Sequence, residues 1–115
     1  KFDAVDYLQN LTYILDLTNT DLGNDTLKVI FISYSGSASV EAHPNELPKA
    51  GEEYYWKSDS IDNQELVITD VERRDAKMGS KLYITVTATR RAIFQLTVWR
   101  ETKGQSLLRL GLIEI

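Results

Sequence analysis

The chain has 115 residues, a formal net charge of −4 at pH 7 and no cysteine. One domain of this length can bury a hydrophobic core without metal or disulfide cross-links. The lack of thiols excludes cysteine nucleophiles and cysteine-ligated metal sites. The acidic balance argues against nucleic acid as a partner, and no apolar run is long enough for a transmembrane helix. Because the first residue is Lys1, we expect a processed or excised piece of a longer protein whose targeting signals lie elsewhere.

Short alternating segments predict strands in the N-terminal part of the chain. Residues 1–5 have the pattern of the end of a strand. The inward side chains of the next strand, residues 11–17, are Leu11, Tyr13, Leu15 and Leu17. Residues 18–26 are polar and predict a turn. Residues 27–34 are apolar on both faces, which is typical of a central strand covered on both sides.

Turn-forming residues divide the middle of the chain. Ser35-Gly36-Ser37 is expected to end the central strand, and a short strand follows with Ala38, Val40 and Ala42 inward. Two prolines and a glycine predict a loop over residues 43–51. An aromatic strand at 53–57 and a polar turn at 58–63 follow.

The next strand has Leu66 and Ile68 inward. Residues 70–77 are charged and are expected to form a connection with one helical turn capped by Asp70. Beyond Gly79, residues 82–89 and 92–99 both alternate strictly, which predicts an antiparallel hairpin around Arg90-Arg91.

No long segment has helical periodicity. Seven or eight short strands separated by polar turns predict an all-β protein, an antiparallel β-sandwich of the jelly-roll or immunoglobulin-like type. We expect this domain to cover residues 1–100, followed by a solvated linker at 101–105.

The C-terminal residues 106–115 are apolar on both faces, and an uncovered apolar tail would aggregate. This segment is therefore expected to be a strand, either of its own domain or donated to a neighbouring copy. Its apolar residues are Leu107, Leu108, Leu110, Leu112, Ile113 and Ile115.

The order of these strands resembles the bacterial-type pre-peptidase C-terminal domain, a secreted β-sandwich. Residues 2–4 stand where that family has its first aromatic strand, and residues 27–33 are similar to its central strand. Residues 79–86 resemble the family's closing Gly-x-tyrosine-tyrosine-isoleucine-x-valine strand, and residues 94–98 its final phenylalanine-x-leucine-x-valine strand.

The resemblance covers residues 1–99 and implies an extracellular protein. The family's opening segment is missing at the N-terminus, whereas residues 107–115 resemble it at the other end. The resemblance thus implies a repeat cut out of register. The acidic residues that precede the family's central strand are represented by Asp21 and Asp25 alone.

Little in the sequence indicates catalysis, and we expect no enzyme and no cofactor. His43 is the one histidine, and the nearby Ser35, Ser37 and Ser39 lack a Gly-x-Ser-x-Gly elbow. The carboxylates available for acid–base chemistry have the character of a solvated rim: Asp59, Asp62, Glu65 and Asp70.

Calcium requires six to eight oxygen ligands, often from a loop rich in Asp and Asn. Residues 19–25 contain suitable atoms in Asp21 and Asp25, but without EF-hand spacing. An ordinary turn explains the same residues.

Aromatic side chains could form a platform on which sugar rings stack. The candidates are Tyr54, Tyr55, Trp56 and Trp99. Because strand residues alternate between faces, Trp56 and Tyr55 must point in opposite directions, so at least one of the group belongs to the core.

Two glycosylation sequons occur, at Asn10 and Asn24. Together with the resemblance they favour an extracellular or cell-surface module. The first hypothesis is a non-catalytic structural or adhesion repeat that joins copies of itself head to tail by C-terminal strand addition. The second hypothesis is a carbohydrate-binding or substrate-targeting module of a secreted protein.

Overall fold

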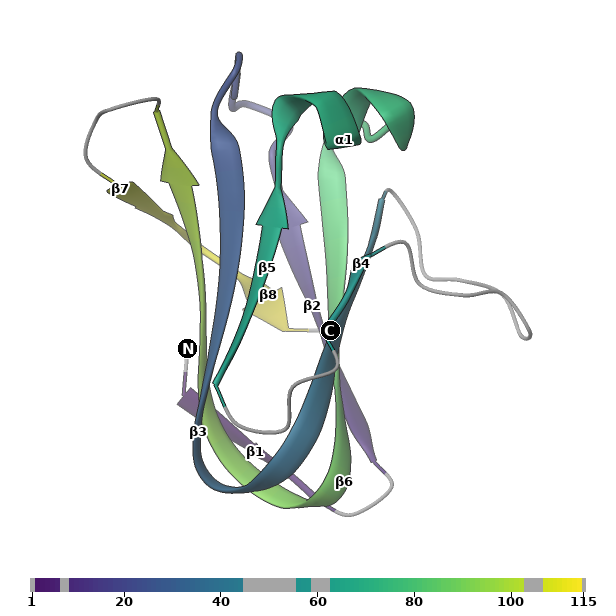
Figure 1. The fold of residues 1–115 in the computed structure, drawn as a ribbon, viewed down its shortest axis with the longest axis vertical. Helices are drawn as coiled ribbons and strands as arrows, with labels where there is room; N and C mark the ends of the chain where they lie inside the picture. Colours follow the sequence, from purple (N-terminus) through teal and green to yellow (C-terminus); the bar gives the residue numbers. More distant parts are fainter. Residues whose placement is uncertain (1, 7–8, 45–55, 59–62, 103–106, 115) are drawn as a thin grey trace.

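The computed structural model describes residues 2–6, 9–44, 56–58, 63–102 and 107–114. Within these residues the protein is mostly antiparallel β-sheet with one short helix (Figure 1). The elements are β1 (Phe2–Val5), β2 (Asn10–Asp16), β3 (Thr26–Pro44), β4 (Trp56–Lys57), β5 (Gln64–Ile68), α1 (Asp70–Asp75), β6 (Lys81–Glu101), β7 (Leu107–Leu110) and β8 (Ile113–Glu114).

Two long strands, β3 and β6, form the centre of the sheet. They pair antiparallel from Thr26↔Glu101 to Pro44↔Leu82. The predicted hairpin around Arg90-Arg91 is therefore wrong, because β6 continues through these residues as one strand of 21 residues. The predicted break at Ser35-Gly36-Ser37 is also wrong, since β3 continues through it with 19 residues.

The two apparent breaks in the sequence are one shared bend. The register between the strands shifts between Ser33 and Ala38, opposite the two arginines. Bulges of this kind bend a strand without ending it. At the bend β3 and β6 turn together, at the bottom of Figure 1, and fold the sheet over on itself.

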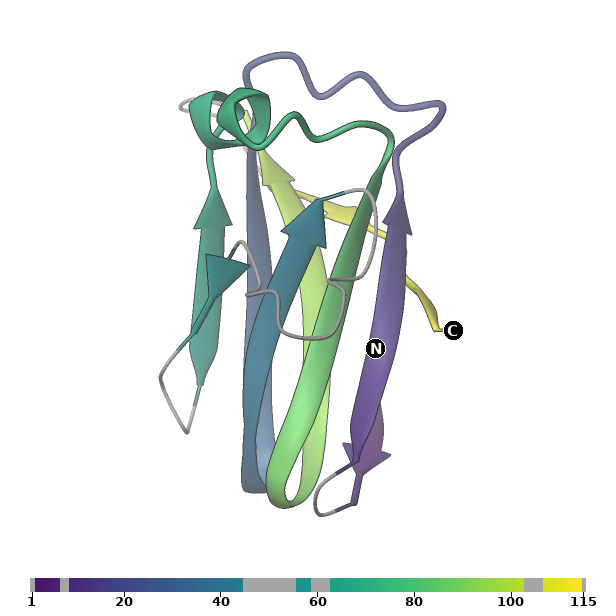
Figure 2. The same cartoon turned by 90° about the vertical axis from the view of Figure 1, so that its right-hand side faces the viewer.

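The fold produces two facing halves. One half contains β5, residues 26–33 of β3, residues 92–101 of β6, β1 and β7. The other contains β4, residues 38–44 of β3, residues 81–88 of β6, β2 and β8. Figure 2 shows α1 at one end of these strands, above β5.

The core lies between the two halves and includes most of the residues predicted to point inward. Side chains from both bent strands are almost completely buried, and the rings of Phe31 and Phe94 stack with centroids 5.1 Å apart. Alternation assigned the faces of the strands other than residues 27–34 correctly, because the buried set includes Leu15, Val40, Ala42, Leu66, Ile68, Leu82, Ile84, Val86, Leu96 and Val98.

Polar side chains also connect the halves. The Tyr13 hydroxyl on β2 donates to Asp3 Oδ2 on β1 at 2.8 Å. Gln64 at the start of β5 is 4% exposed and bonds the backbone of the opposite half. Its Nε2 donates to the Ala38 carbonyl at 2.6 Å, and its Oε1 accepts from the Val40 amide at 3.3 Å. The Gln64 side chain thus bonds the part of β3 that lies between its pairing with β5 and its pairing with β4.

The expected helical turn is present, but Thr69 caps it rather than Asp70. The Thr69 hydroxyl accepts a hydrogen bond from the Glu72 amide at 3.2 Å. The Glu72 carboxylate in turn accepts from the Thr69 hydroxyl at 3.2 Å, so the two side chains also bond each other at the start of the helix. The helix ends in a Schellman motif in which Met78 N donates to Arg73 O and Lys77 N to Arg74 O.

Candidate functional site

A cleft lies beside α1, where the β2–β3 loop meets the connection from α1 to β6. Its volume is about 340 Å³, at the lower end of the range for small-ligand sites. The lining residues are Leu17, Thr20, Asp21, Leu22, Gly23, Asn24, Asp70, Arg73, Arg74, Lys77, Met78 and Gly79.

The charged groups around this cleft are engaged with the chain itself. Arg74 pairs with Asp70 at 3.6 Å. Arg73 is buried and donates to the Asp25 carbonyl at 2.5 Å and the Gly23 carbonyl at 3.2 Å. Burial lowers the pKa of Arg73, although the charges of Asp70 and Asp25 oppose that shift. The arrangement clamps the loop to the helix.

The candidate calcium loop is held by a second arginine. Arg100 donates from Nε to Asp25 Oδ2 at 2.8 Å and from Nη2 to the Asp21 carbonyl at 3.0 Å. The hydrogen bond from Arg100 to the Asp25 carboxylate holds the pKa of Asp25 below its usual range. Asp21 Oδ1 accepts from the Gly23 amide at 2.9 Å. The Arg100 guanidinium therefore already binds the Asp25 carboxylate, which was proposed as a cation ligand.

Across residues 2–6, 9–44, 56–58, 63–102 and 107–114, no three His, Asp or Glu side chains gather as a metal site. His43 Nδ1 lies 3.3 Å from the backbone carbonyl oxygen of the next residue, Pro44. Ser37 is buried, and its hydroxyl contacts that of Thr89 at 2.6 Å. Glu65 is exposed on β5, and Asp59 and Asp62 lie outside the described residues.

The candidate sugar platform is not assembled from the residues that can be placed. Trp56 is 8% exposed, lies in the core and donates from Nε1 to Glu72 Oε2 at 3.0 Å. Trp99 lies on β6 in the other half of the sheet. Tyr54 and Tyr55 lie outside the described residues.

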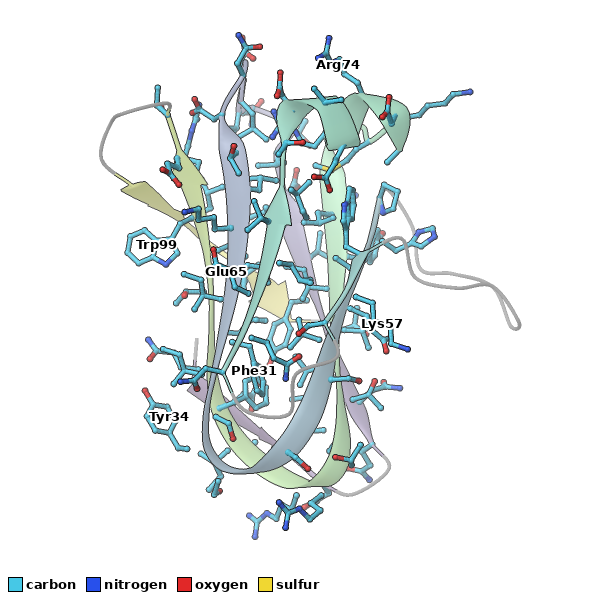
Figure 3. The ribbon with its side chains drawn as sticks, viewed as in Figure 1. Phe31, Tyr34, Lys57, Glu65, Arg74 and Trp99 are labelled. Carbon is cyan, nitrogen blue, oxygen red and sulfur yellow. The ribbon has the colours of Figure 1, made fainter. Side chains whose placement is uncertain are left out.

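A different aromatic and aliphatic face was not predicted. Tyr34 is 55% exposed and Ile93 is 45% exposed. Tyr34 projects from the β3–β6 half that also carries Trp99 (Figure 3), and Ile93 lies opposite Ser35 in that half. The Tyr34 hydroxyl donates to Gln95 Oε1 at 2.9 Å. The apolar character of residues 27–34 on both faces predicted a strand covered on both sides, and that prediction is wrong at Tyr34, which is exposed.

Both sequon asparagines are exposed. Asn10 begins β2, and Asn24 lies in the turn before β3. A glycan on either side chain would enter solvent without displacing the core.

The C-terminal segment pairs with its own domain. Strand β7 pairs with residues 98–101 of β6, and β8 pairs with Tyr13 and Ile14 of β2. The short segment therefore touches both halves of the sheet. Leu110 and Leu112 pack partly buried against the core. The predicted linker begins inside β6, which extends to Glu101, and residues 103–106 lie outside the described part.

No family model, curated protein or solved structure gives a significant match to this chain. No helix in the described residues is both long and apolar enough to cross a membrane.

Proposed function

We propose that this chain is a non-catalytic extracellular structural module, one repeat of an assembly that copies of it form through the C-terminal segment. We further propose that the folded-over sheet is an antiparallel β-sandwich of jelly-roll or immunoglobulin-like type. One observation carries the proposal. The short C-terminal strands pair with both halves of the sheet: β7 pairs with β6 in one half, and β8 pairs with β2 in the other.

The interactions of this appendage do not depend on which copy supplies it. Backbone hydrogen bonds to β6 and β2 require an extended segment in the correct register. Leu110 and Leu112 add apolar burial, worth about 25 cal/mol for each Å² removed from water. A second copy carries the same segment and can make the same contacts.

Analytical ultracentrifugation of the intact chain over a range of concentrations tests this proposal. We expect the mean mass to rise with concentration. Leu110→Asp places a charge against the core and should abolish the rise. Val67→Asp is the control, because Val67 is 45% exposed on β5, away from the C-terminal segment. A monomer at all concentrations, or equal loss in both variants, would contradict self-association through this segment.

The extracellular location is supported by the two exposed sequons and by the resemblance to the pre-peptidase C-terminal domain. Expression through a eukaryotic secretory pathway should add glycan mass at Asn10 and Asn24. Asn10→Gln and Asn24→Gln, separately and together, identify the occupied position by mass spectrometry.

A glycan-binding module is the second candidate, and the face that carries the exposed Tyr34 and the half-buried Trp99 favours it. The Tyr34 ring is held by its hydrogen bond to Gln95, so its face is preorganised for stacking. Titration with soluble glycans should change the fluorescence of Trp99, and Trp99→Phe should remove this change. No change at millimolar sugar would exclude this candidate.

A further inference from the structure

Arg73 is a buried cation that has no counter-ion of its own within the described part of the chain. The residue is 9% exposed, and its guanidinium donates to the backbone carbonyls of Asp25 and Gly23. No described carboxylate oxygen lies within 4.0 Å of that guanidinium. A buried charge is normally paired with an opposite charge, because its removal from water is costly. A negative group placed beside Arg73 would therefore be favourable.

The two carboxylates whose charges act on Arg73 are held by other arginines. Asp70 pairs with Arg74 at 3.6 Å, and Asp25 pairs with Arg100 at 2.7 Å. These groups comprise three cations and two anions. The other charged residues that line the cleft balance each other: Lys77 and Asp21. The cleft and the arginines around it thus carry an excess positive charge, although the chain as a whole has a net charge of −4.

The Arg73 guanidinium also retains N–H donors for a ligand. Its bonds to the two carbonyls come from Nη1 and Nη2, and a guanidinium has more N–H groups than these bonds use. Nε makes no hydrogen bond to the described residues, yet every fully buried side-chain nitrogen among them has a partner. Nε must therefore be open to solvent. Arg73 lines the cleft beside α1, so the cleft is where this donor is accessible.

The other lining residues add an apolar surface and further positive charge. Leu17 belongs to the core, and Leu22 and Met78 pack partly buried against it. Arg74, in the last turn of α1, and Lys77, just after the helix, are exposed. The volume of about 340 Å³ fits a small molecule. An apolar body that carries one anionic group matches both kinds of lining residue.

We propose that this cleft binds a small organic anion, whose carboxylate or phosphate group pairs with Arg73 and whose apolar part contacts Leu22 and Met78. The planar guanidinium suits both groups, since each presents oxygens to two parallel N–H donors. None of the lining residues belongs to β7, to β8 or to the face with Tyr34. The site is therefore independent of self-association and of glycan binding, and it stands or falls without them.

NMR titration of the intact, ¹⁵N-labelled chain with matched probes tests the proposal. The probes are phenyl phosphate and benzoate, with benzyl alcohol as the neutral analogue and inorganic phosphate as the anion without an apolar part. We expect saturable shifts of the Gly23 and Gly79 amides with phenyl phosphate or benzoate at millimolar concentration. The tighter of the two identifies the preferred anionic group. Saturation by neither anion, or equal binding of benzyl alcohol or of inorganic phosphate, would overturn the proposal.

Variants then locate the anionic group. Arg73→Lys keeps the charge but loses the planar pair of donors, so the better anion should bind roughly tenfold more weakly. Arg74→Gln removes an exposed charge from the rim and should weaken binding roughly threefold. The control is Arg91→Gln, which makes the same change of charge at the bend, at the opposite end of the strands from α1 (Figure 2).

The rim variant keeps the test decisive, because Arg73 also holds the β2–β3 loop and Arg73→Lys could lose its fold. The amide spectrum of each variant without ligand shows whether the loop is intact. Unchanged binding in a folded Arg73→Lys would overturn the assignment of the anionic group. Equal weakening in Arg74→Gln and Arg91→Gln would attribute binding to the overall charge of the protein and would overturn the site.

Discussion

Gly36 of β3 lies directly against the backbone of Arg91 in β6. A Cβ atom at position 36 would overlap the Arg91 carbonyl oxygen and lie 2.8 Å from Cα of Ala92. The φ angle of Gly36 is also +73°, which side chains disfavour. The bend shared by the two longest strands therefore requires glycine for two separate reasons.

Gly36→Ala is expected to destabilise the protein by more than about 3 kcal/mol, because the clash is with backbone that cannot rotate away. Gly23→Ala is the matched control. Its φ is +53°, but a Cβ there meets nothing within 4 Å, so we expect a loss of about 1 kcal/mol. Urea denaturation of both variants provides the measurement. Equal losses would show that the close approach to Arg91 contributes nothing.

The same contact explains what the sequence could and could not predict. Alternation assigns inward residues because every strand has one face on the core, and this holds on both sides of Arg90-Arg91. The pattern does not distinguish a turn from a bend, since both interrupt alternation with polar or small residues. Only the pairing of Ser35-Gly36-Ser37 with the two arginines, over 50 residues away in sequence, makes them one feature.

The polar contacts between distant elements were also beyond sequence reasoning. Arg73 is charged and adjacent to Arg74, which favours a solvated helix. It is buried because loop carbonyls of Gly23 and Asp25 lie within reach. Asp25 belongs to a loop whose composition is suitable for calcium, yet Arg100 is its partner. Such partners are set by the topology and leave no local pattern.

The Asp25–Arg100 pair is expected to make stability depend on acid pH. The hydrogen bond from Arg100 lowers the pKa of Asp25 below its ordinary value of 3.8. A depressed pKa in the folded state contributes stability that is present above the unfolded pKa and is lost as pH falls through the folded pKa.

Thermal unfolding between pH 2 and pH 7 tests this dependence. The melting temperature of Asp25→Asn should fall less steeply below pH 4 than that of the unaltered chain. Asp75→Asn, an exposed position on α1, makes the same change of charge and serves as the control. Parallel curves for Asp25→Asn and the unaltered chain would refute the role of the pair.

Lys77 occupies the position after α1 that normally favours glycine. Its φ is +53°, and its amide closes the Schellman motif to Arg74. Lys77→Gly is expected to raise the free energy of unfolding by about 1 kcal/mol, because glycine adopts this conformation without steric cost. Lys77→Ala keeps the cost and should give no gain. Chemical denaturation distinguishes the two variants, and a gain in both would assign the effect to the lost charge.

Gln64 stabilises the bend from inside the core. Gln64→Leu removes the partner of the Ala38 carbonyl and of the Val40 amide, and each buried unsatisfied group costs roughly 1–3 kcal/mol. We expect a loss of about 2–4 kcal/mol in denaturation and, in hydrogen exchange, a selective loss of protection at the Val40 amide. Glu65→Leu, on the exposed face of the same strand, should change neither quantity by much. If Val40 stayed protected in Gln64→Leu, the Gln64 side chain would not be the partner of the Val40 amide, and Gln64 would link the halves by packing alone.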